Sequence, residues 1–315
     1  PNGWRVSGSL PVGFYPQFYR DAQRGDDAAA LERAIVEWGP AVGTLVRGVA
    51  MHSVGLEMDH TEFSALAAVC ARHGLLALAA FGLGDSYPER YGKAIAAFAK
   101  RSDCAGVGFD CEGVWENEPD DPDDARRMMG TFRAEAPDAF AFDQPWPVPT
   151  LHSRFPDEQF ARAVDIRCSQ DYFNDWKRIH GRARYAKLLP WFTRSQATLD
   201  ARLAQKGIRT PRGSTLQGYE WEDIFPDLID CLLRRASQFT LVWCDPLPSR
   251  AFVLGLLVVT KLRELGFTGP DAVRAFQTSA RGILNVDGRC GRQTAKALGL
   301  TTVQLDAARI LPLGA

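Results

Sequence analysis

The sequence has almost no net charge, and its basic residues are not gathered into runs. Its 37 lysines and arginines nearly balance its 38 aspartates and glutamates. Proteins that follow a phosphate backbone carry clustered lysine and arginine side chains, and no such cluster occurs in this sequence. We therefore expect no nucleic acid among the partners of this protein.

Long apolar runs are also missing. The longest candidate, "AFVLGLLVVT" at residues 251–260, leads directly into the charged segment "KLRELG". A helix needs roughly 20 apolar residues to span a bilayer. The sequence therefore predicts a soluble protein with no membrane partner.

Cysteine and histidine are too few or too irregularly spaced for several kinds of chemistry. The seven cysteines are odd in number and show no close spacing pattern, which argues against a disulfide framework. The five histidines form no spacing typical of zinc ligands: His52, His60, His73, His152 and His180. We expect no metal and no organic cofactor.

The sequence does contain a regular alternation of short apolar runs and amphipathic stretches. The runs predict eight strands, at 10–16, 44–53, 75–85, 104–113, 139–146, 165–173, 184–192 and 239–246. The amphipathic stretches predict helices at 27–38, 60–73, 88–101, 122–135, 156–164, 195–206 and 222–237. This alternation, with eight predicted strands, favours an α/β fold, a closed (β/α)8 barrel of the TIM type over residues 1–250. An open doubly wound sheet is the alternative, but no Gly-x-Gly-x-x-Gly follows the first strand.

From about residue 251 the strands stop and short helical patterns take over. The helix "AVRAFQ" (272–277), the turn "NVDGRCGRQT" (285–294) and "AKAL" (295–298) resemble the three-helix peptidoglycan-binding domain found on many cell-wall hydrolases. The turn has that family's Asp-Gly-x-x-Gly-x-x-Thr form. The resemblance implies a small all-α domain over residues 251–315 whose partner is peptidoglycan, the bacterial cell-wall glycan.

The fourth predicted strand ends in two carboxylates. Because side chains alternate along a strand, one face carries Gly106, Gly108, Asp110 and Glu112, and the other carries Val107, Phe109 and Cys111. The bulky face suits packing against helices, so Asp110 and Glu112 are expected inside the barrel at the carboxyl end of the strand. Barrels keep their active sites at that end.

Two carboxylates about 7 Å apart on one face of a strand do not both ionise easily in a poorly solvated site. Cleavage of a glycosidic bond needs a carboxylic acid that can protonate the leaving oxygen. The sequence therefore predicts Glu112 as general acid and Asp110 as its partner. The alternative is a pair of solvated loop carboxylates.

The Asp-x-Glu at this position is similar to two glycosidase families with barrel folds. In the lysozymes of glycoside hydrolase family 25 the Glu is the general acid, and the resemblance implies a further acid at Asp245 in "VWCDP". The family 18 signature, Asp-x-x-Asp-x-Asp-x-Glu, is matched only in its last two acids. That resemblance implies Tyr172 as the holder of the substrate N-acetyl group and Trp243 as a sugar platform.

Further polar and aromatic residues at predicted strand ends complete the expected site. Asp143 is taken to share a face with Ala141, with Phe140 and Phe142 on the opposite face, and is a candidate catalytic carboxylate. Aromatic rings stack on sugars, although a tryptophan is more often a core residue. The candidate substrate-binding residues are Tyr15, His52, Asp85, Trp146, Gln170, Trp191 and Trp243.

Together these patterns predict a monomeric, lysozyme-like peptidoglycan hydrolase, made in the cytoplasm and acting at the bacterial cell wall. It would be a muramidase or an N-acetylglucosaminidase, and the sequence leaves open a retaining, an inverting or a substrate-assisted mechanism. Two alternatives stay open: a peptidoglycan amidase or peptidase, and a non-catalytic wall-binding protein. A thiol peptidase that uses Cys168 and His180 is disfavoured because Cys168 is in phase with the barrel interior below Gln170.

Overall fold

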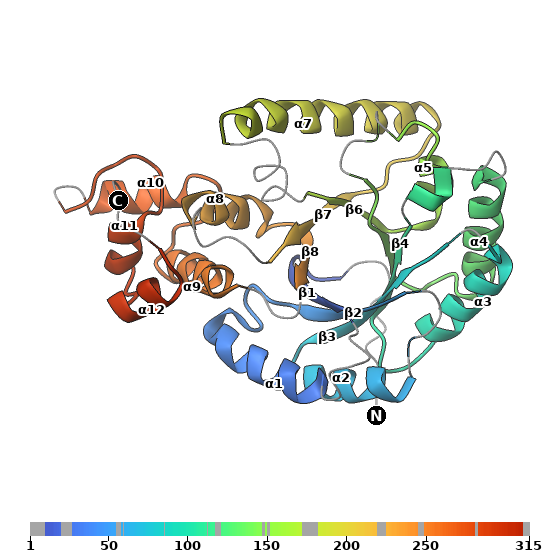
Figure 1. Cartoon of the computed structure of the whole chain (residues 1–315), viewed down its shortest axis with the longest axis horizontal. Coiled ribbons are helices and arrows are strands. Elements are labelled where there is room, and N and C mark those ends of the chain that lie inside the picture. Colours follow the sequence, from blue (N-terminus) through green and yellow to red (C-terminus); the bar gives the residue numbers. More distant parts are fainter. Residues whose placement is uncertain are drawn as a thin grey trace.

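Eight parallel strands form a closed barrel in the computed structural model (Figure 1). The structure describes residues 10–19, 27–54, 58, 60–84, 86–111, 113–116, 121–146, 149, 152–171, 182–218, 225–244, 249–280 and 283–310. The strands are β1 (Gly13–Tyr19), β2 (Gly48–Val54), β3 (Leu76–Gly82), β4 (Gly106–Asp110), β5 (Ala141–Asp143), β6 (Ile166–Gln170), β7 (Arg212–Gln217) and β8 (Phe239–Cys244). Because β1 pairs with both β2 and β8, the predicted (β/α)8 barrel is confirmed and the open sheet is excluded.

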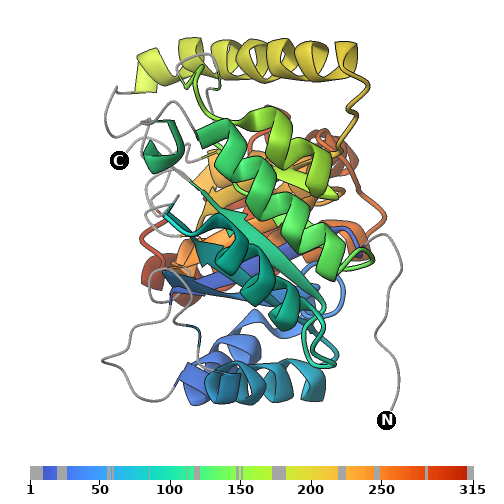
Figure 2. The ribbon, with the colours of Figure 1, turned by 90° about the vertical axis from the view of Figure 1, so that its right-hand side faces the viewer.

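Helices surround the barrel. They are α1 (Asp27–Trp38), α2 (His60–Arg72), α3 (Pro88–Ala99), α4 (Asp121–Glu135), α5 (Asp157–Ala163), α7 (Arg182–Gln205), α8 (Phe225–Arg235) and α9 (Arg250–Glu264), with 3-10 turns η1 (Gly39–Ala41) and η2 (Gly113–Glu116). Figure 2 shows α3, α4 and α5 side by side on one flank. None of the described helices is long and apolar enough to cross a membrane.

The seventh strand lies elsewhere than predicted. The backbone of residues 182–205 is one helix, α7, which covers both the predicted strand 184–192 and the predicted helix 195–206. The strand β7 follows at 212–217, in "RGSTLQ". A short apolar run is compatible with a strand or with a helix. β7 was not predicted as a strand because its only large apolar residue is Leu216. Trp191 therefore lies within α7 and not at a strand end, so its prediction as a strand-end sugar platform is wrong.

The barrel interior below the carboxyl ends is filled by apolar side chains. They include Tyr15, Leu78, Phe140, Phe142, Cys168, Phe239 and Leu241. Gly106 and Gly108 make room for two of the rings. A Cβ on Gly106 would lie 2.7 Å from the Phe140 ring, and one on Gly108 would overlap the ring of Phe142. The two glycines of β4 are therefore required by packing.

Helix α9 completes the ring of helices. The predicted C-terminal domain begins at residue 251 and so includes this helix, but α9 packs on α8 so closely that a Cβ on Gly255 would lie 2.8 Å from Leu232. Its side chains Phe252, Leu256, Val259 and Leu262 are fully buried. The Arg263 guanidinium donates to the carbonyl oxygen of Ala236, just after α8, at 3.1 Å. The packing therefore ties α9 to the barrel.

Three short helices follow: α10 (Ala272–Ser279), α11 (Arg292–Ala297) and α12 (Thr302–Ala307). Figure 1 shows them beside α8 and α9. Phe267 and Phe276 meet edge to face at 5.7 Å between ring centroids. Arg289 forms an ion pair with Asp227 of α8 at 3.1 Å, so the C-terminal helices contact the barrel directly.

Candidate functional site

A layer of polar side chains lies on the barrel interior at the carboxyl ends of the strands. Each member stands two residues beyond an interior residue of its own strand, as β-alternation requires. We call this set the polar layer: Gln17, His52, Asp110, Gln144, Gln170, Thr215, Gln217 and Trp243. Asp110 and Trp243 are half-buried and the others are buried. Active sites of such barrels lie at this end.

Asp110, the last residue of β4, is held from two neighbouring strands. One carboxylate oxygen, Oδ2, lies 3.0 Å from His52 Nε2, and the other, Oδ1, accepts a hydrogen bond from Gln170 Nε2 at 3.0 Å. The His52 and Asp110 side chains are only 4% and 11% exposed. An ionised carboxylate can only accept hydrogen bonds, so the ionised form of Asp110 pairs with the His52 tautomer that carries a proton on Nε2.

A glycine allows His52 to reach Asp110. His52 lies on β2 and Asp110 on β4, with Gly82 of β3 between them. A Cβ on Gly82 would lie 3.3 Å from the His52 ring, closer than most side-chain contacts. The Trp243 ring meets the His52 ring edge to face at 5.0 Å between centroids. The structure therefore brings together four predicted site residues, Asp110, His52, Gln170 and Trp243.

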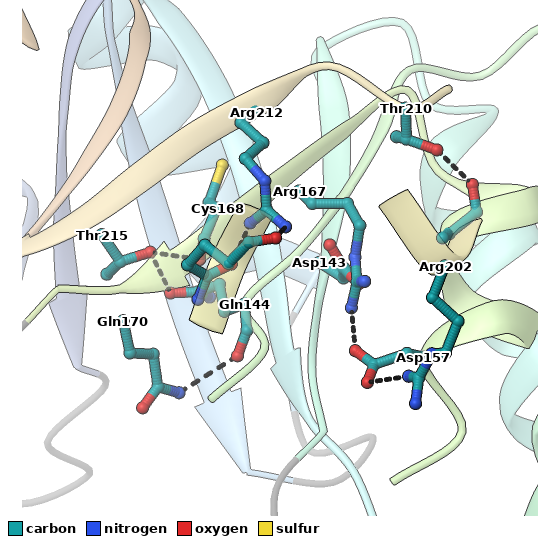
Figure 3. A network of polar contacts seen from close by, with 12 residues as sticks. Asp143, Gln144, Asp157, Arg167, Cys168, Gln170, Arg202, Thr210, Arg212 and Thr215 are labelled. Atoms are coloured by element: carbon teal, nitrogen blue, oxygen red, sulfur yellow. Dashed lines mark hydrogen bonds and ion pairs between the residues drawn. The ribbon is translucent and has the colours of Figure 1, made fainter. Parts of the chain in front are cut away.

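Sequence reasoning missed four members of the polar layer. They are Gln17, Gln144, Thr215 and Gln217. The Thr215 hydroxyl lies 3.3 Å from Gln144 Oε1 and 3.1 Å from the Cys168 carbonyl oxygen, and Gln170 Nε2 also donates to the backbone oxygen of Gln144 at 3.2 Å (Figure 3). The alternation from Tyr15 could have identified Gln17. Gln144 was missed because Asp143, and not Phe142, had been assigned to the inner face of β5.

Asp143 does not belong to the site. Phe142 faces the barrel interior, so its neighbour Asp143 faces outward, against α5. There Arg167 Nε binds Asp143 Oδ2 at 2.9 Å, and Arg167 Nη2 binds Asp157 at 2.8 Å. Figure 3 shows this group apart from Gln144 and Gln170. The prediction of a catalytic Asp143 is wrong because Gly108 leaves the interior space to the Phe142 ring.

The ionisation of Asp143 reflects its surroundings. Burial raises the pKa of Asp143 to about 6, the Arg167 guanidinium opposes that shift, and the nearby Asp157 carboxylate adds to it. Arg167 bridges the two buried carboxylates and Arg202 contacts Asp157 at 3.4 Å, so burial, and not an excess of negative charge, is the main cause of the raised pKa of Asp143. This titration belongs to the strand–helix interface and not to the polar layer.

Two aromatic residues predicted to bind substrate have other contacts. Tyr15 is fully buried in the interior below the polar layer, where its hydroxyl donates to Pro11 O at 2.6 Å, and burial raises its pKa. Its prediction as a substrate-binding residue is wrong, because that hydroxyl points to the amino end of the barrel. Trp146 stacks on His152 at 4.7 Å, and His152 Nδ1 binds Glu116 at 2.7 Å, so one face of the Trp146 ring is covered.

Four predicted site residues lie outside the described residues: Asp85, Glu112, Tyr172 and Asp245. The chain next to Glu112 is firmly anchored. Trp115 of η2 is fully buried, and its indole N–H donates to Leu83 O at 2.8 Å. Leu83 in turn donates its backbone N–H to Asp110 O at 3.3 Å. The segment after β4 is thus tied to the end of β3.

Within the described ranges, no group of three His, Cys, Asp or Glu side chains could hold a metal ion. All seven cysteines are free thiols, and five of them are buried. Burial raises the pKa of the Cys168 thiol, which lies in the apolar interior. Such a thiol is a poor nucleophile.

The C-terminal turn is built around the buried side chain of Gln277. Its Nε2 donates to Asp287 Oδ1 at 2.9 Å, to Arg289 O at 3.0 Å and to Thr294 Oγ1 at 3.1 Å. Its Oε1 accepts from the backbone N–H of Gly288 at 2.8 Å. Gly288 has φ +76°, which favours glycine. The Asp-Gly-x-x-Gly-x-x-Thr pattern is therefore a turn organised by one glutamine.

Comparison with known proteins gives structural similarity only. No model of a known protein family matches the sequence, and no curated protein matches it. Among solved structures, the chain is similar to a GH10 xylanase of Thermobacillus composti, with 12% identity, a TM-score of 0.41 and coverage of 74% of this chain and 83% of the xylanase. It is also similar to beta-glucuronidase 2 of Bacteroides uniformis, with 10% identity, a TM-score of 0.44 and coverage of 79% of this chain. A glycosyl hydrolase family 2 member from Bacteroides cellulosilyticus has 12% identity, a TM-score of 0.42 and coverage of 81% of this chain. The chain spans 35% and 32% of the length of the last two proteins.

Proposed function

We propose that this protein is a glycoside hydrolase that cuts the N-acetylated glycan strands of peptidoglycan. The observation that carries the proposal is the position of Asp110. Its carboxylate faces the barrel interior at the carboxyl end of β4 and accepts hydrogen bonds from His52 and Gln170. It stands two residues before Glu112, which the proposal makes the proton donor.

The composition of the polar layer suits a sugar. Four of its eight members are glutamines, which offer both donors and acceptors without charge, and Trp243 adds an aromatic ring. Asp110 is the one carboxylate of the layer, and no lysine or arginine belongs to it. A ligand with many neutral hydroxyl and amide groups matches this lining better than a phosphate or a carboxylate does.

In the proposed reaction Glu112 donates its proton to the glycosidic oxygen as the bond from that oxygen to C1 breaks. The Asp110 charge two residues away disfavours ionisation of Glu112 and so keeps this proton available. Glu112 would then accept a proton from the water that completes hydrolysis.

The developing positive charge at C1 needs a partner. With Asp143 removed from the site, Asp110 is the sole carboxylate of the polar layer among the described residues. This favours attack by the substrate's own acetamido oxygen on C1, with Asp110 and Tyr172 steadying the acetamido group. Attack by Asp245 or by a water that it activates is the other route.

The choice of peptidoglycan rests on the C-terminal helices. Their turn resembles that of a peptidoglycan-binding domain, and Gln277 holds it together. A wall-binding segment beside a glycan-cutting barrel would raise the local concentration of substrate. We propose that the protein acts at the bacterial cell wall as a monomer.

The test compares Glu112→Gln with the matched control Glu116→Gln on purified cell-wall sacculi. We expect Glu112→Gln to solubilise sacculi at least about 100-fold more slowly, because the general acid is lost. It should still sediment with the sacculi. Glu116 binds His152 and lies outside the polar layer, so Glu116→Gln should keep its activity.

Two results would contradict the proposal. A non-catalytic binder would sediment with sacculi without solubilising them, whichever variant is used. A peptidoglycan amidase or peptidase would release new amino groups instead of new sugar reducing ends.

A further inference from the structure

Two glutamines of the polar layer keep amide atoms without a partner among the described residues. Gln17 of β1 is fully buried, and neither its Nε2 nor its Oε1 has a hydrogen-bond partner there. Gln144 is 1% exposed, and its Nε2 has none, although its Oε1 accepts from Thr215. These three atoms are two donors and one acceptor.

Such atoms are uncommon in folded proteins. Nearly all buried polar groups have a hydrogen-bond partner. A polar group that is buried without one loses its hydrogen bonds to water and gains none in the protein. The other glutamine amides that hold structure in this chain are well paired, as Gln277 and Gln170 show. The open positions of Gln17 and Gln144 therefore point to a ligand.

Both residues belong to the layer that contains Asp110. Gln17 is in register with Trp243 of β8, and Gln144 accepts at its backbone oxygen from Gln170, whose amide also binds Asp110. β1 and β5 are four strands apart in the closed order of eight, so the two amides approach from opposite walls. A ligand beside Asp110 would lie between them.

The chemistry of the open atoms defines what they bind. One face of the ligand must offer both an acceptor and a donor to Gln17, and another must offer an acceptor to Gln144. Acetamido and hydroxyl groups of a sugar meet both needs without charge. A carboxylate or phosphate would have to be desolvated beside the Asp110 carboxylate and beside amides that cannot neutralise it.

We propose that Gln17 and Gln144 are substrate-binding residues that hydrogen-bond the neutral acetamido and hydroxyl groups of an N-acetylated sugar beside Asp110. The choice of sugar rests on the proposed function, whereas the open amide atoms do not. The substitution Gln→Met keeps the length of each side chain and removes its hydrogen-bonding groups.

The test measures two quantities in full-length Gln17→Met and Gln144→Met. One is the affinity for the β-1,4-linked tetramer of N-acetylglucosamine, measured by calorimetry with Glu112→Gln added to prevent cleavage. The other is the urea midpoint of unfolding without ligand. We expect each Met variant to bind the tetramer about tenfold more weakly, the value of one or two hydrogen bonds. The unfolding midpoint should stay unchanged or rise, since a buried unpaired amide is removed.

A structural role would give the opposite pattern, with a lower unfolding midpoint and unchanged affinity, and would overturn the inference. Absence of tetramer binding by Glu112→Gln alone would also overturn it. Gln159→Met on α5, outside the polar layer, is the matched control and should change neither quantity. If the wild-type protein releases no reducing ends while the Met variants still bind more weakly, the proposed function fails and the binding site stands.

Discussion

Gly106 and Gly108 show how single residues set the barrel interior. Neither glycine is needed for a turn, because both lie within β4. Their missing side chains leave space for Phe140 and Phe142, which turn inward as a result. That inward turn places Asp143 outside the barrel and Gln144 inside it.

Gly108→Ala should destabilise the protein by about 1–3 kcal/mol, because the new methyl group overlaps the rigid Phe142 ring. The cost should shrink in a Phe142→Leu background, where the ring is absent. Gly130→Ala on α4 is the control: its Cβ would meet nothing within 4 Å, so we expect a gain of about 1 kcal/mol. Urea unfolding measures the change in stability for Gly108→Ala, for the same substitution in the Phe142→Leu background, and for Gly130→Ala. Equal costs for Gly108→Ala with and without Phe142 would contradict this packing.

Asp143→Asn should keep glycan-cutting activity within about twofold, because Asp143 lies outside the polar layer. The pKa of Asp143 is about 6 in the folded protein, above its ordinary value of 3.8. The native state therefore binds this proton more tightly than the unfolded state does. Protonation of Asp143 therefore contributes to the free energy of unfolding. This contribution has its full value below pH 3.8 and is lost as the pH rises through 6.

The measurement compares the unfolding free energies of wild type and Asp143→Asn from about pH 3.5 to about pH 7.5. This range covers the pKa of Asp143 in both the unfolded and the folded protein. Wild type should lose stability relative to the variant as the pH rises. A gain of stability with pH would contradict the raised pKa of Asp143, and a large loss of activity in the variant would contradict its position outside the polar layer.

Alternation explains which residues of the site were predictable. On β4, side-chain alternation predicted Asp110 on the inner face. His52, Gln170 and Trp243 were predicted from their places at strand ends, and the structure brings all four together. On β5 the two phenylalanines looked like an outward, helix-packing face. Only the contact between Gly108 and Phe142, which lie 34 positions apart, reverses that assignment, and no local pattern contains it.

At the scale of elements, the loop after β4 depends on one tryptophan. Trp115 ties η2 to Leu83, and Leu83 is bonded to the backbone of Asp110. A change at Trp115 should therefore disturb the site through the backbone, although its side chain lies outside the polar layer.

Trp115→Phe should lower stability by about 1–2 kcal/mol, since the Leu83 carbonyl loses its donor. The rate of glycan cleavage should fall several-fold at temperatures where the variant is fully folded. Circular dichroism confirms the folded state, and steady-state rates give the effect. An unchanged rate with lowered stability would mean that this tie has no role in positioning the site.

Seven of the eight strands were predictable from the sequence, and the exception is informative. β7 carries Arg212, Gly213, Ser214, Thr215, Leu216 and Gln217, and so lacks the apolar run that marks the other strands. Its outward Ser214 bonds Asp171, and its inward Thr215 belongs to the polar layer. A strand with polar side chains on both faces has no apolar pattern in its sequence, so hydrophobic periodicity does not predict it.

At the scale of the whole molecule, the barrel and the C-terminal helices share α9. The division at residue 250 stays a prediction, and the packing of α9 allows it to be tested. A chain ending at residue 266 keeps α9 and removes α10, α11 and α12. A chain ending at residue 250 removes α9 as well.

We expect the chain ending at residue 266 to unfold cooperatively and to cut the soluble tetramer, but to lose binding to sacculi. The chain ending at residue 250 should fail to fold, because it exposes the surface of α8 that Phe252, Leu256 and Gly255 cover. Urea unfolding followed by near-ultraviolet circular dichroism distinguishes the two. A cooperative transition in the shorter chain would place α9 outside the barrel unit.

The role of Asp110 in glycan cleavage is tested most directly by measuring the new sugar reducing ends that the wild type and Asp110→Asn release from purified peptidoglycan. The substitution keeps the shape of the side chain and removes the charge held between His52 and Gln170. We expect new hexosamine reducing ends with the wild type and at least about 100-fold fewer with the folded variant. Equal release by both proteins, or none by the wild type, would contradict it.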